Sequence, residues 1–136
     1  MLTLRPATVR DAQVLFEWRN DPHTRDMSKT TDPVTWDTHV AWLNNRLGLS
    51  EPHLYVAKDA SGNPVGTIRI DEDSTSDEST VGYTVAPQSR KRGYATQMLQ
   101  WAYNNFGSLV AEIKPGNEAS VRAAPKAGHK VVFLSN

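Results

Sequence analysis

A glycine-containing loop at a strand-to-helix junction sets the firmest limit on the fold. Residues 80–85 read as a strand, and apolar residues spaced by three and four predict a helix over residues 95–106: Ala95, Met98, Leu99, Ala102 and Phe106. The run Arg90-Lys91-Arg92-Gly93 joins the two. A glycine lets a ligand approach the backbone, and the first turn of a helix attracts anions. The junction indicates a pyrophosphate site for a nucleotide-tailed cofactor, although a solvated basic turn fits the same residues.

The rest of the chain alternates strands with helices. Further strands are expected over residues 2–5, 54–57, 65–70, 109–113 and 131–134. Further helices are expected from about Asp11, from Asp32-Pro33 and from near Asn117 or Ser120. This order predicts one α/β domain over residues 1–136, with a mixed central sheet and helices on both faces.

Two short patterns refine these helices. Thr8 followed by Asp11 predicts a capping box at the start of the first helix. Pro125 falls inside the last expected helix, where a proline removes a backbone donor, so that helix is expected to be short or broken.

Composition excludes several classes of function. The chain contains no cysteine, which rules out disulfides, thiolate metal sites and cysteine nucleophiles. Lysine plus arginine equal aspartate plus glutamate at 15 each, so no bulk positive field would hold nucleic acid. No run approaches the roughly 20 apolar residues of a membrane span, and the N-terminus does not read as a signal peptide, so we expect a cytoplasmic protein without membrane contact. The histidines show no metal-site spacing, and no metal is expected.

Charge is nevertheless segregated along the chain. Residues 71–78 carry five carboxylates. They predict a solvated hairpin loop, with recognition of a cationic substrate as the less favoured alternative.

Five segments in order carry a family resemblance. The glycine loop reads Arg90-Lys91-Arg92-Gly93-Tyr94-Ala95, and the others are residues 4–8 with Asp11, residues 64–69, residues 82–87, and residues 117–122 with 126–128. With these motifs the chain resembles the GNAT superfamily of acyl-CoA-dependent N-acetyltransferases. The resemblance implies the GNAT fold with a splay between the fourth and fifth strands, and acetyl-CoA as cosubstrate. The family usually adds two strands after the region of Gly128, whereas one is expected here, so a homodimer that completes the sheet is one expectation.

The resemblance also implies roles for the donor side. The N–H of Val85 would polarise the thioester carbonyl, and Asn117 would contact the pantetheine arm. The pyrophosphate would be held by residues of the glycine loop: Arg90, Arg92, Gly93, Tyr94, Ala95 and Thr96. Many relatives place a proton-donating tyrosine where this chain has Ala124. Ser120 or an ordered water would then protonate the leaving thiolate, although a serine at a helix start is equally often a cap.

The acceptor side is expected on the first two helices. The segment Phe16–Pro22 contains Trp-Arg-Asn-Asp and resembles the branch of amino-sugar (pseudaminic-acid type) and ribosomal-protein N-terminal acetyltransferases. Trp18, Asn20, Arg25 and His39 are the expected acceptor-binding residues. His39 is also the best candidate to relay the amine proton, because an unperturbed histidine titrates near working pH. Local capping by Asn20 and a structural role for His39 remain the alternatives.

These patterns lead to one expected function and two alternatives. We expect an acetyltransferase that moves an acetyl group from acetyl-CoA to a primary amine of a small molecule, with a nucleotide-linked amino sugar as the leading acceptor. A protein N-terminus is the alternative acceptor. A non-catalytic acyl-CoA-binding domain is the alternative class.

Overall fold

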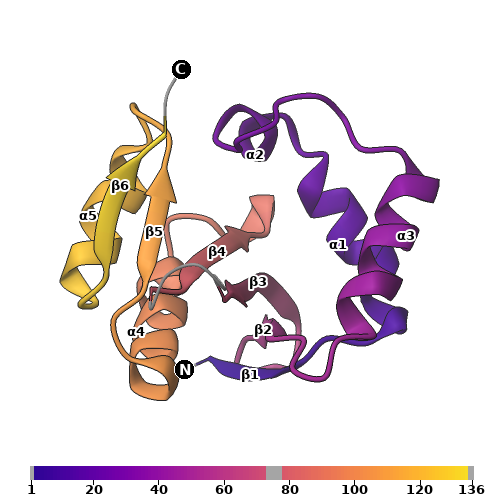
Figure 1. Ribbon diagram of the computed structural model, residues 1–136, viewed down its shortest axis with the longest axis horizontal. Helices are drawn as coiled ribbons and strands as arrows, with labels where there is room; N and C mark the ends of the chain where they lie inside the picture. Colours follow the sequence, from indigo (N-terminus) through magenta and orange to yellow (C-terminus); the bar gives the residue numbers. More distant parts are fainter. Residues whose placement is uncertain (1, 73–77, 135–136) are drawn as a thin grey trace.

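Six strands form one central sheet in a computed structural model that describes residues 2–72 and 78–134 (Figure 1). In the described residues the strands are β1 (Thr3–Pro6), β2 (Leu54–Lys58), β3 (Pro64–Asp71), β4 (Thr80–Val85), β5 (Val110–Ile113) and β6 (Lys130–Phe133). The helices are α1 (Ala12–Arg19), α2 (Pro22–Asp26), α3 (Trp36–Leu47), α4 (Tyr94–Phe106) and α5 (Glu118–Lys126), with 3-10 turns η1 (Val9–Asp11) and η2 (Pro87–Ser89). The predicted α/β fold with a mixed sheet is confirmed. Most of the acidic stretch, residues 73–77, lies outside the described residues.

The sheet opens between β4 and β5. Strands β1 to β4 are antiparallel neighbours in chain order, and β5 and β6 add on in parallel. β4 pairs with β3 as far as Val85, but its pairing with β5 joins Thr80 to Val110 and Val81 to Ala111 and extends no further in the described residues. The C-terminal half of β4 therefore has a free backbone edge, which confirms the expected splay.

Helices cover both faces of the sheet and form two apolar cores. The crossovers β4–α4–β5 and β5–α5–β6 each add the next parallel strand on the same side of the preceding one. Because such crossovers are right-handed, α4 and α5 lie on the same face of the sheet. That core includes Met98, Leu99, Ala102, Ala123 and Ala124. On the other face, α1 and α3 supply Leu15, Trp18 and Leu43. Strand β2 alternates between the two cores, because Leu54 and Val56 belong to the second and Ala57 to the first.

The segment between α1 and α3 differs from the prediction. The sequence predicts a helix from Asp32-Pro33, but α3 begins at Trp36, where the Thr35 hydroxyl accepts a hydrogen bond from the Thr38 N–H at 3.3 Å. Helix α2 is not predicted at all. Asp21 caps it and Pro22 is its first residue, a pairing that favours a helix start as well as the end of the preceding helix.

The two short patterns have different outcomes. The capping box is confirmed, since the Asp11 carboxylate accepts a hydrogen bond from the Thr8 N–H at 2.8 Å. Arg5 also binds Asp11 through both terminal nitrogens, and this contact outweighs burial and lowers the pKa of Asp11. Helix α5 is short but unbroken, because Pro125 stands in its last turn, where few backbone bonds remain to be lost.

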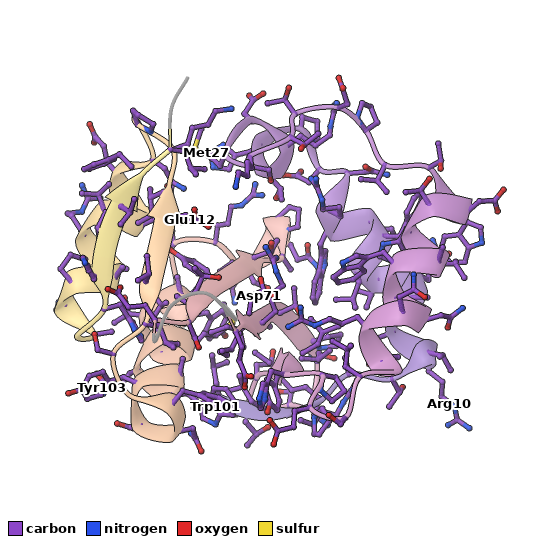
Figure 2. All side chains as sticks on the ribbon, in the orientation of Figure 1. Arg10, Met27, Asp71, Trp101, Tyr103 and Glu112 are labelled. Carbon is purple, nitrogen blue, oxygen red and sulfur yellow. The ribbon has the colours of Figure 1, made fainter. Side chains whose placement is uncertain are left out.

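Side chains fill the space between the sheet and its helices (Figure 2). The labelled Arg10 and Tyr103 lie at the periphery, and both side chains are exposed. In the part of the chain that the structure describes, no helix is both long and apolar enough to cross a membrane.

Candidate active site

A groove of about 690 Å³ follows the open edge of β4. One wall consists of β4, the loop before α4 and the first turn of α4. The opposite wall consists of β5, the start of α5 and residues 23–30 in and after α2. The splay creates this groove, because a strand that continued the pairing of β4 with β5 would fill it.

Val85 presents a backbone N–H to the groove. The neighbouring Ala86 N–H donates to the carbonyl oxygen of Val65 at 2.8 Å, on the β3 side. Successive N–H groups of a strand point to opposite edges, so the Val85 N–H points to the open edge. A donor in this position can polarise a carbonyl group that lies in the groove.

The first turn of α4 also faces the groove with its backbone. Gly93 caps the helix in the left-handed conformation (φ 79°), and no side chain caps it. The first N–H groups of a helix have no acceptor one turn earlier, and Tyr94, Ala95 and Thr96 supply them here. A Cβ placed on Gly93 would have no heavy atom within 4 Å. The first turn of α4 is therefore open to an anion. Residue 93 must adopt a left-handed backbone conformation there, which restricts the position to glycine or a residue that tolerates this conformation.

The basic residues of the loop have different environments. Arg90, which the sequence assigns to the pyrophosphate, donates from Nη2 to Asp21 Oδ2 at 2.6 Å and to Thr24 Oγ1 at 3.1 Å. Arg90 therefore fastens this loop to the start of α2. Lys91 and Arg92 are exposed, and Lys91 borders the groove whereas Arg92 does not. The phosphate contact expected of Arg92 stays a prediction.

The start of α5 brings two hydroxyl groups together in the groove. The side chain of Asn117 caps α5 by accepting a hydrogen bond from the Ser120 N–H at 3.4 Å, so the Ser120 hydroxyl is not the cap. That hydroxyl is instead hydrogen-bonded to the Tyr83 hydroxyl. Burial raises the pKa of Tyr83, an effect that the bond to Ser120 only partly offsets. Ala124 is fully buried in the core.

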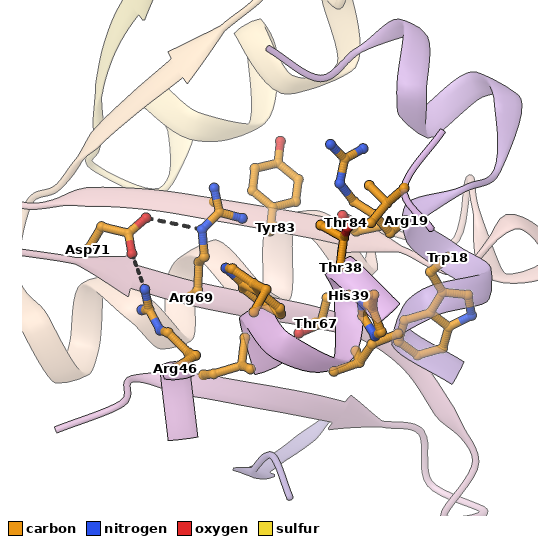
Figure 3. Close-up of a pocket in the computed structure, with 15 residues that line it drawn as sticks. Trp18, Arg19, Thr38, His39, Arg46, Thr67, Arg69, Asp71, Tyr83 and Thr84 are labelled. Carbon is orange, nitrogen blue, oxygen red and sulfur yellow. Dashed lines mark hydrogen bonds and ion pairs between the residues drawn. The ribbon is translucent and has the colours of Figure 1, made fainter. Parts of the chain in front are cut away.

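A second cavity of about 500 Å³ lies on the α1 and α3 face of the sheet (Figure 3). Six residues border both this cavity and the groove: Arg19, Arg69, Asp71, Gly82, Tyr83 and Thr84. The two spaces therefore meet at β4. A small molecule in the cavity can reach a group held against the free edge of β4.

His39 lines this cavity and is almost wholly buried. Its Nε2 lies 2.9 Å from the carbonyl oxygen of Ala12, which can only accept, so Nε2 carries the proton. Burial lowers the pKa of His39, and the nearby charge of Arg19 lowers it further, against the opposing effect of the Ala12 bond. The imidazole is therefore neutral at working pH and keeps Nδ1 as an unprotonated acceptor.

The structure divides the other expected acceptor residues into two groups. Trp18 lines the cavity beside His39. Asn20 instead binds both backbone groups of Val34, at 2.8 Å and 2.7 Å, and Arg25 donates to the carbonyl oxygens of Asn20 and Thr31. Asn20 and Arg25 border neither space and hold the segment between α1 and α3 in place.

The sequence prediction omits the charged residues of the cavity. These are Arg19, Arg46, Arg69 and Asp71. A signal for two of them exists in β3, where buried Ile68 and Ile70 alternate with Arg69 and Asp71. The alternation places the charged pair on the opposite face of the sheet from the α4 and α5 core.

Two further histidines, His129 and His53, border neither the groove nor the cavity. The buried ring of His129 accepts from the Leu109 N–H at 3.0 Å and donates to the Leu99 carbonyl oxygen at 2.8 Å. His53 is partly buried, and its Nε2 lies 3.7 Å from Glu51 and 3.5 Å from Glu72, whose side chains are exposed. These three side chains are close enough to share a cation, a proximity that the sequence spacing does not indicate.

Comparisons with known proteins agree with this geometry. No curated protein matches the chain in sequence. Among solved structures, a candidate phosphinothricin N-acetyltransferase has 26% identity and a TM-score of 0.74, covering 94% of this chain and 82% of the other. A candidate acetyltransferase from Salmonella typhimurium, solved with acetyl-CoA, has 22% identity and a TM-score of 0.72, with 93% and 78% covered. Spermidine N-acetyltransferase from Vibrio cholerae, solved with CoA and spermine, has 17% identity and a TM-score of 0.77, with 93% and 79% covered.

A family comparison covers nearly the whole chain. Residues 1–130 match the acetyltransferase (GNAT) domain. This match includes the splayed strands, the glycine loop and the start of α5. The chain therefore belongs to the GNAT acetyltransferase family.

Proposed function

We propose that this protein transfers an acetyl group from acetyl-CoA to a primary amine of a small molecule by direct attack. The observation that supports this most strongly is the meeting of two spaces at β4. One is a groove lined by unpaired backbone N–H groups, and the other is a cavity lined by side chains. A neighbour solved with acetyl-CoA, and another solved with CoA and spermine, share the fold of this chain.

The groove would hold the donor mainly through backbone groups. The N–H groups of Gly93, Tyr94, Ala95 and Thr96 at the start of α4 would bind the pyrophosphate, with Arg92 adding charge. The pantetheine arm would follow the free edge of β4 past Asn117. The acetyl carbonyl would then accept a hydrogen bond from the Val85 N–H, which stabilises the negative charge that develops on its oxygen during attack.

The amine must reach the thioester without its extra proton. A primary alkyl amine is mostly protonated at neutral pH, since its pKa is roughly 10, as for lysine. His39 can accept this proton at Nδ1, directly or through a water molecule, because its lowered pKa leaves that nitrogen unprotonated at neutral pH. The amine nitrogen then forms a bond to the carbonyl carbon as the bond from carbon to sulfur breaks, and it releases its second proton to solvent to leave a neutral amide.

The leaving thiolate needs a proton, and the Ser120–Tyr83 pair can supply it. Ala124 offers no hydroxyl where relatives have a tyrosine, but the Ser120 hydroxyl borders the groove and is hydrogen-bonded to Tyr83. Burial keeps Tyr83 protonated at neutral pH. We propose that Ser120 donates to the sulfur and recovers its proton from Tyr83, which is later reprotonated from solvent.

The acceptor itself is proposed more narrowly as an amino sugar linked to a nucleotide. Its sugar would enter the cavity between Trp18 and His39, while the nucleotide extends outward. The alternatives are a protein N-terminus as acceptor and a domain that binds acyl-CoA without turnover.

Titration calorimetry and a thiol-release assay separate these possibilities. We expect CoA and acetyl-CoA to bind, and a panel of amino sugars, amino acids and N-terminal peptides to release CoA with at least one acceptor. Binding without release for every amine would favour the non-catalytic alternative. No binding of CoA would overturn the proposal.

A further inference from the structure

Arg19 has a hydrogen-bonding group that the protein leaves without a partner. Its Nη1 atom is buried and makes no hydrogen bond within residues 2–72 and 78–134. Burial, together with the positive charges of Arg69 and Arg25, lowers the pKa of Arg19. A buried donor without a partner is costly, so a group from outside the protein, such as a water molecule, an ion or a ligand, is expected to satisfy it. Arg19 lines the cavity, so a ligand in that cavity can supply the acceptor.

Arg69 is held in the same cavity by its neighbours. Its Nε donates to Asp71 Oδ2 at 3.0 Å, and no bond from its terminal nitrogens to another described residue is found. The guanidinium lies flat over Gly82 on the adjacent strand, since a Cβ at residue 82 would stand only 2.7 Å from Arg69 Cζ. The glycine therefore makes room for this guanidinium. In Figure 3 the Tyr83 ring is drawn between the guanidinium groups of Arg69 and Arg19.

Arg46 contrasts with these two arginines because the protein occupies its donors. It donates to the carbonyl oxygens of Pro52 at 2.7 Å and Ile70 at 2.8 Å, and it is paired with Asp71. Burial opposes the ionisation of Asp71, but Arg46 and Arg69 outweigh it and lower the pKa of that carboxyl group. Among the described residues, the cavity wall carries three guanidinium groups and one carboxylate, that of Asp71. The net charge of the cavity wall is therefore positive.

From these contacts we infer that Arg19 and Arg69 form an anion-binding subsite, and that the amine acceptor of this enzyme carries a carboxylate or phosphate group. This inference rests on the proposed function and names its substrate class. Guanidinium groups bind both kinds of anion through pairs of charge-assisted hydrogen bonds. The positive cavity also disfavours an ammonium group and favours the neutral amine that must attack the thioester. A polycation such as a polyamine would meet repulsion at the same place.

Matched pairs of acceptors test the inference and distinguish the two anions. One pair is glucosamine 6-phosphate and glucosamine, and the other is phenylalanine and phenylalaninamide. Spermidine serves as the cationic amine. With acetyl-CoA present, we expect the member of at least one pair that carries the phosphate or carboxylate to show a kcat/KM at least about tenfold higher than its partner without that group. The pair that responds identifies phosphate or carboxylate as the recognised anion. Preference for spermidine or for the uncharged partners would overturn the inference.

Variants of the arginines connect the preference to this subsite. Arg19→Gln and Arg69→Gln should each reduce the preference for the anionic partner about tenfold or more, and this effect should exceed any change in CoA affinity, because the pyrophosphate site lies at residues 93–96. Arg19→Lys keeps the charge and should retain part of the preference. Arg10→Gln removes an exposed arginine at the periphery and should change nothing (Figure 2). An unchanged preference in both glutamine variants would overturn the inference even if the enzyme is active.

A binding measurement separates this inference from the proposed function. Calorimetry with glucosamine 6-phosphate or phenylalanine, in the presence of CoA, does not require turnover. If no amine releases CoA but an anionic ligand binds and Arg19→Gln abolishes that binding, the proposed activity fails while the subsite stands. If acetyl transfer proceeds and neither anionic ligand binds better than its uncharged partner, the activity stands while the subsite fails.

Discussion

The groove and the cavity meet at β4 but are built from different parts of the chain. The groove offers a ligand mainly backbone N–H groups, from Val85 and from the first turn of α4. The cavity offers side chains, with Trp18 and His39 on the helices and Arg69 on β3. Backbone donors depend on the conformation of the chain more than on residue type, whereas a side-chain wall changes with every substitution. We infer that the groove is suited to one fixed donor and that the cavity sets the choice of acceptor.

The largest expected effect tests the backbone half of this comparison. Gly93→Val forces a β-branched residue into a left-handed conformation and fills the open space before α4. We expect CoA affinity to fall about a hundredfold or more, measured by calorimetry. Gly107→Val is the matched control, because Gly107 has φ 78° at the other end of α4 and lies outside the groove. An equal loss of affinity in both variants would attribute the effect to helix strain.

A smaller effect is expected where side chains take part in the groove. Tyr83→Phe and Ser120→Ala should each lower kcat about tenfold to a hundredfold with little change in the KM for acetyl-CoA, because they interrupt the proton supply to the thiolate. The kcat of the combined variant should be no lower than that of the less active single variant, since both residues serve one step. Tyr103→Phe, outside both spaces, is the control. Unchanged turnover in Tyr83→Phe would leave the pair with a structural role.

His39 tests the side-chain half of the comparison. His39→Gln should lower turnover about tenfold and leave CoA affinity unchanged. The control variant His53→Gln should change neither turnover nor CoA affinity. Because the folded-state pKa of His39 lies below the ordinary value of 6.5, the folded chain resists protonation there. Stability is unaffected above that pH and falls as pH drops from 6.5 toward the folded-state pKa. Urea unfolding at pH of about 7.5 and about 5.5 should show this loss in the wild type and not in His39→Gln. If His39→Gln lost as much stability at the lower pH as the wild type, the loss would not come from His39.

The smallest effect concerns the ion pair of Arg90 and Asp21, which joins the glycine loop to the start of α2. If Arg90 mainly fastens the loop to α2, Arg90→Gln and Asp21→Asn should each lower the free energy of unfolding by about 1 kcal/mol or less. The double variant should lose little more than either single one, because both remove the same ion pair. Thermal or urea unfolding measures this. A loss of CoA affinity in Arg90→Gln that is absent in Asp21→Asn would support the predicted role of Arg90 as a phosphate ligand.

The sequence predicts the groove better than the cavity, for a physical reason. Gly93 and the periodic apolar residues of α4 lie within one short segment, and their spacing indicates a helix start with open N–H groups. The loss of the expected tyrosine at Ala124 is equally visible in the sequence. The splay of β4 is implied by family resemblance, because nothing in residues 80–85 alone shows where pairing with β5 ends.

The cavity depends on contacts between distant segments. The groove also has one such contact, because Arg90 and Asp21 are 69 positions apart and their pairing is not readable from either segment. Trp18 and His39 both line the cavity, and they lie on amphipathic helices that the sequence indicates. Their role in acceptor binding stays a prediction. Asn20 and Arg25 have the right chemistry for an acceptor, but they bond to the backbone of the segment that precedes α3. Only the packing of α1 against the sheet shows that Arg19 and Arg69 face one space.

Amide chemical shifts test the account most directly. In a ¹H–¹⁵N spectrum of the protein titrated with CoA, we predict the largest changes at Val85 and at residues 93–96, with small changes at Trp18 and His39. An anionic amine added afterwards should move the signals of the cavity residues. Saturating CoA that leaves residues 93–96 unmoved, while shifting signals elsewhere, would contradict the assignment of the groove.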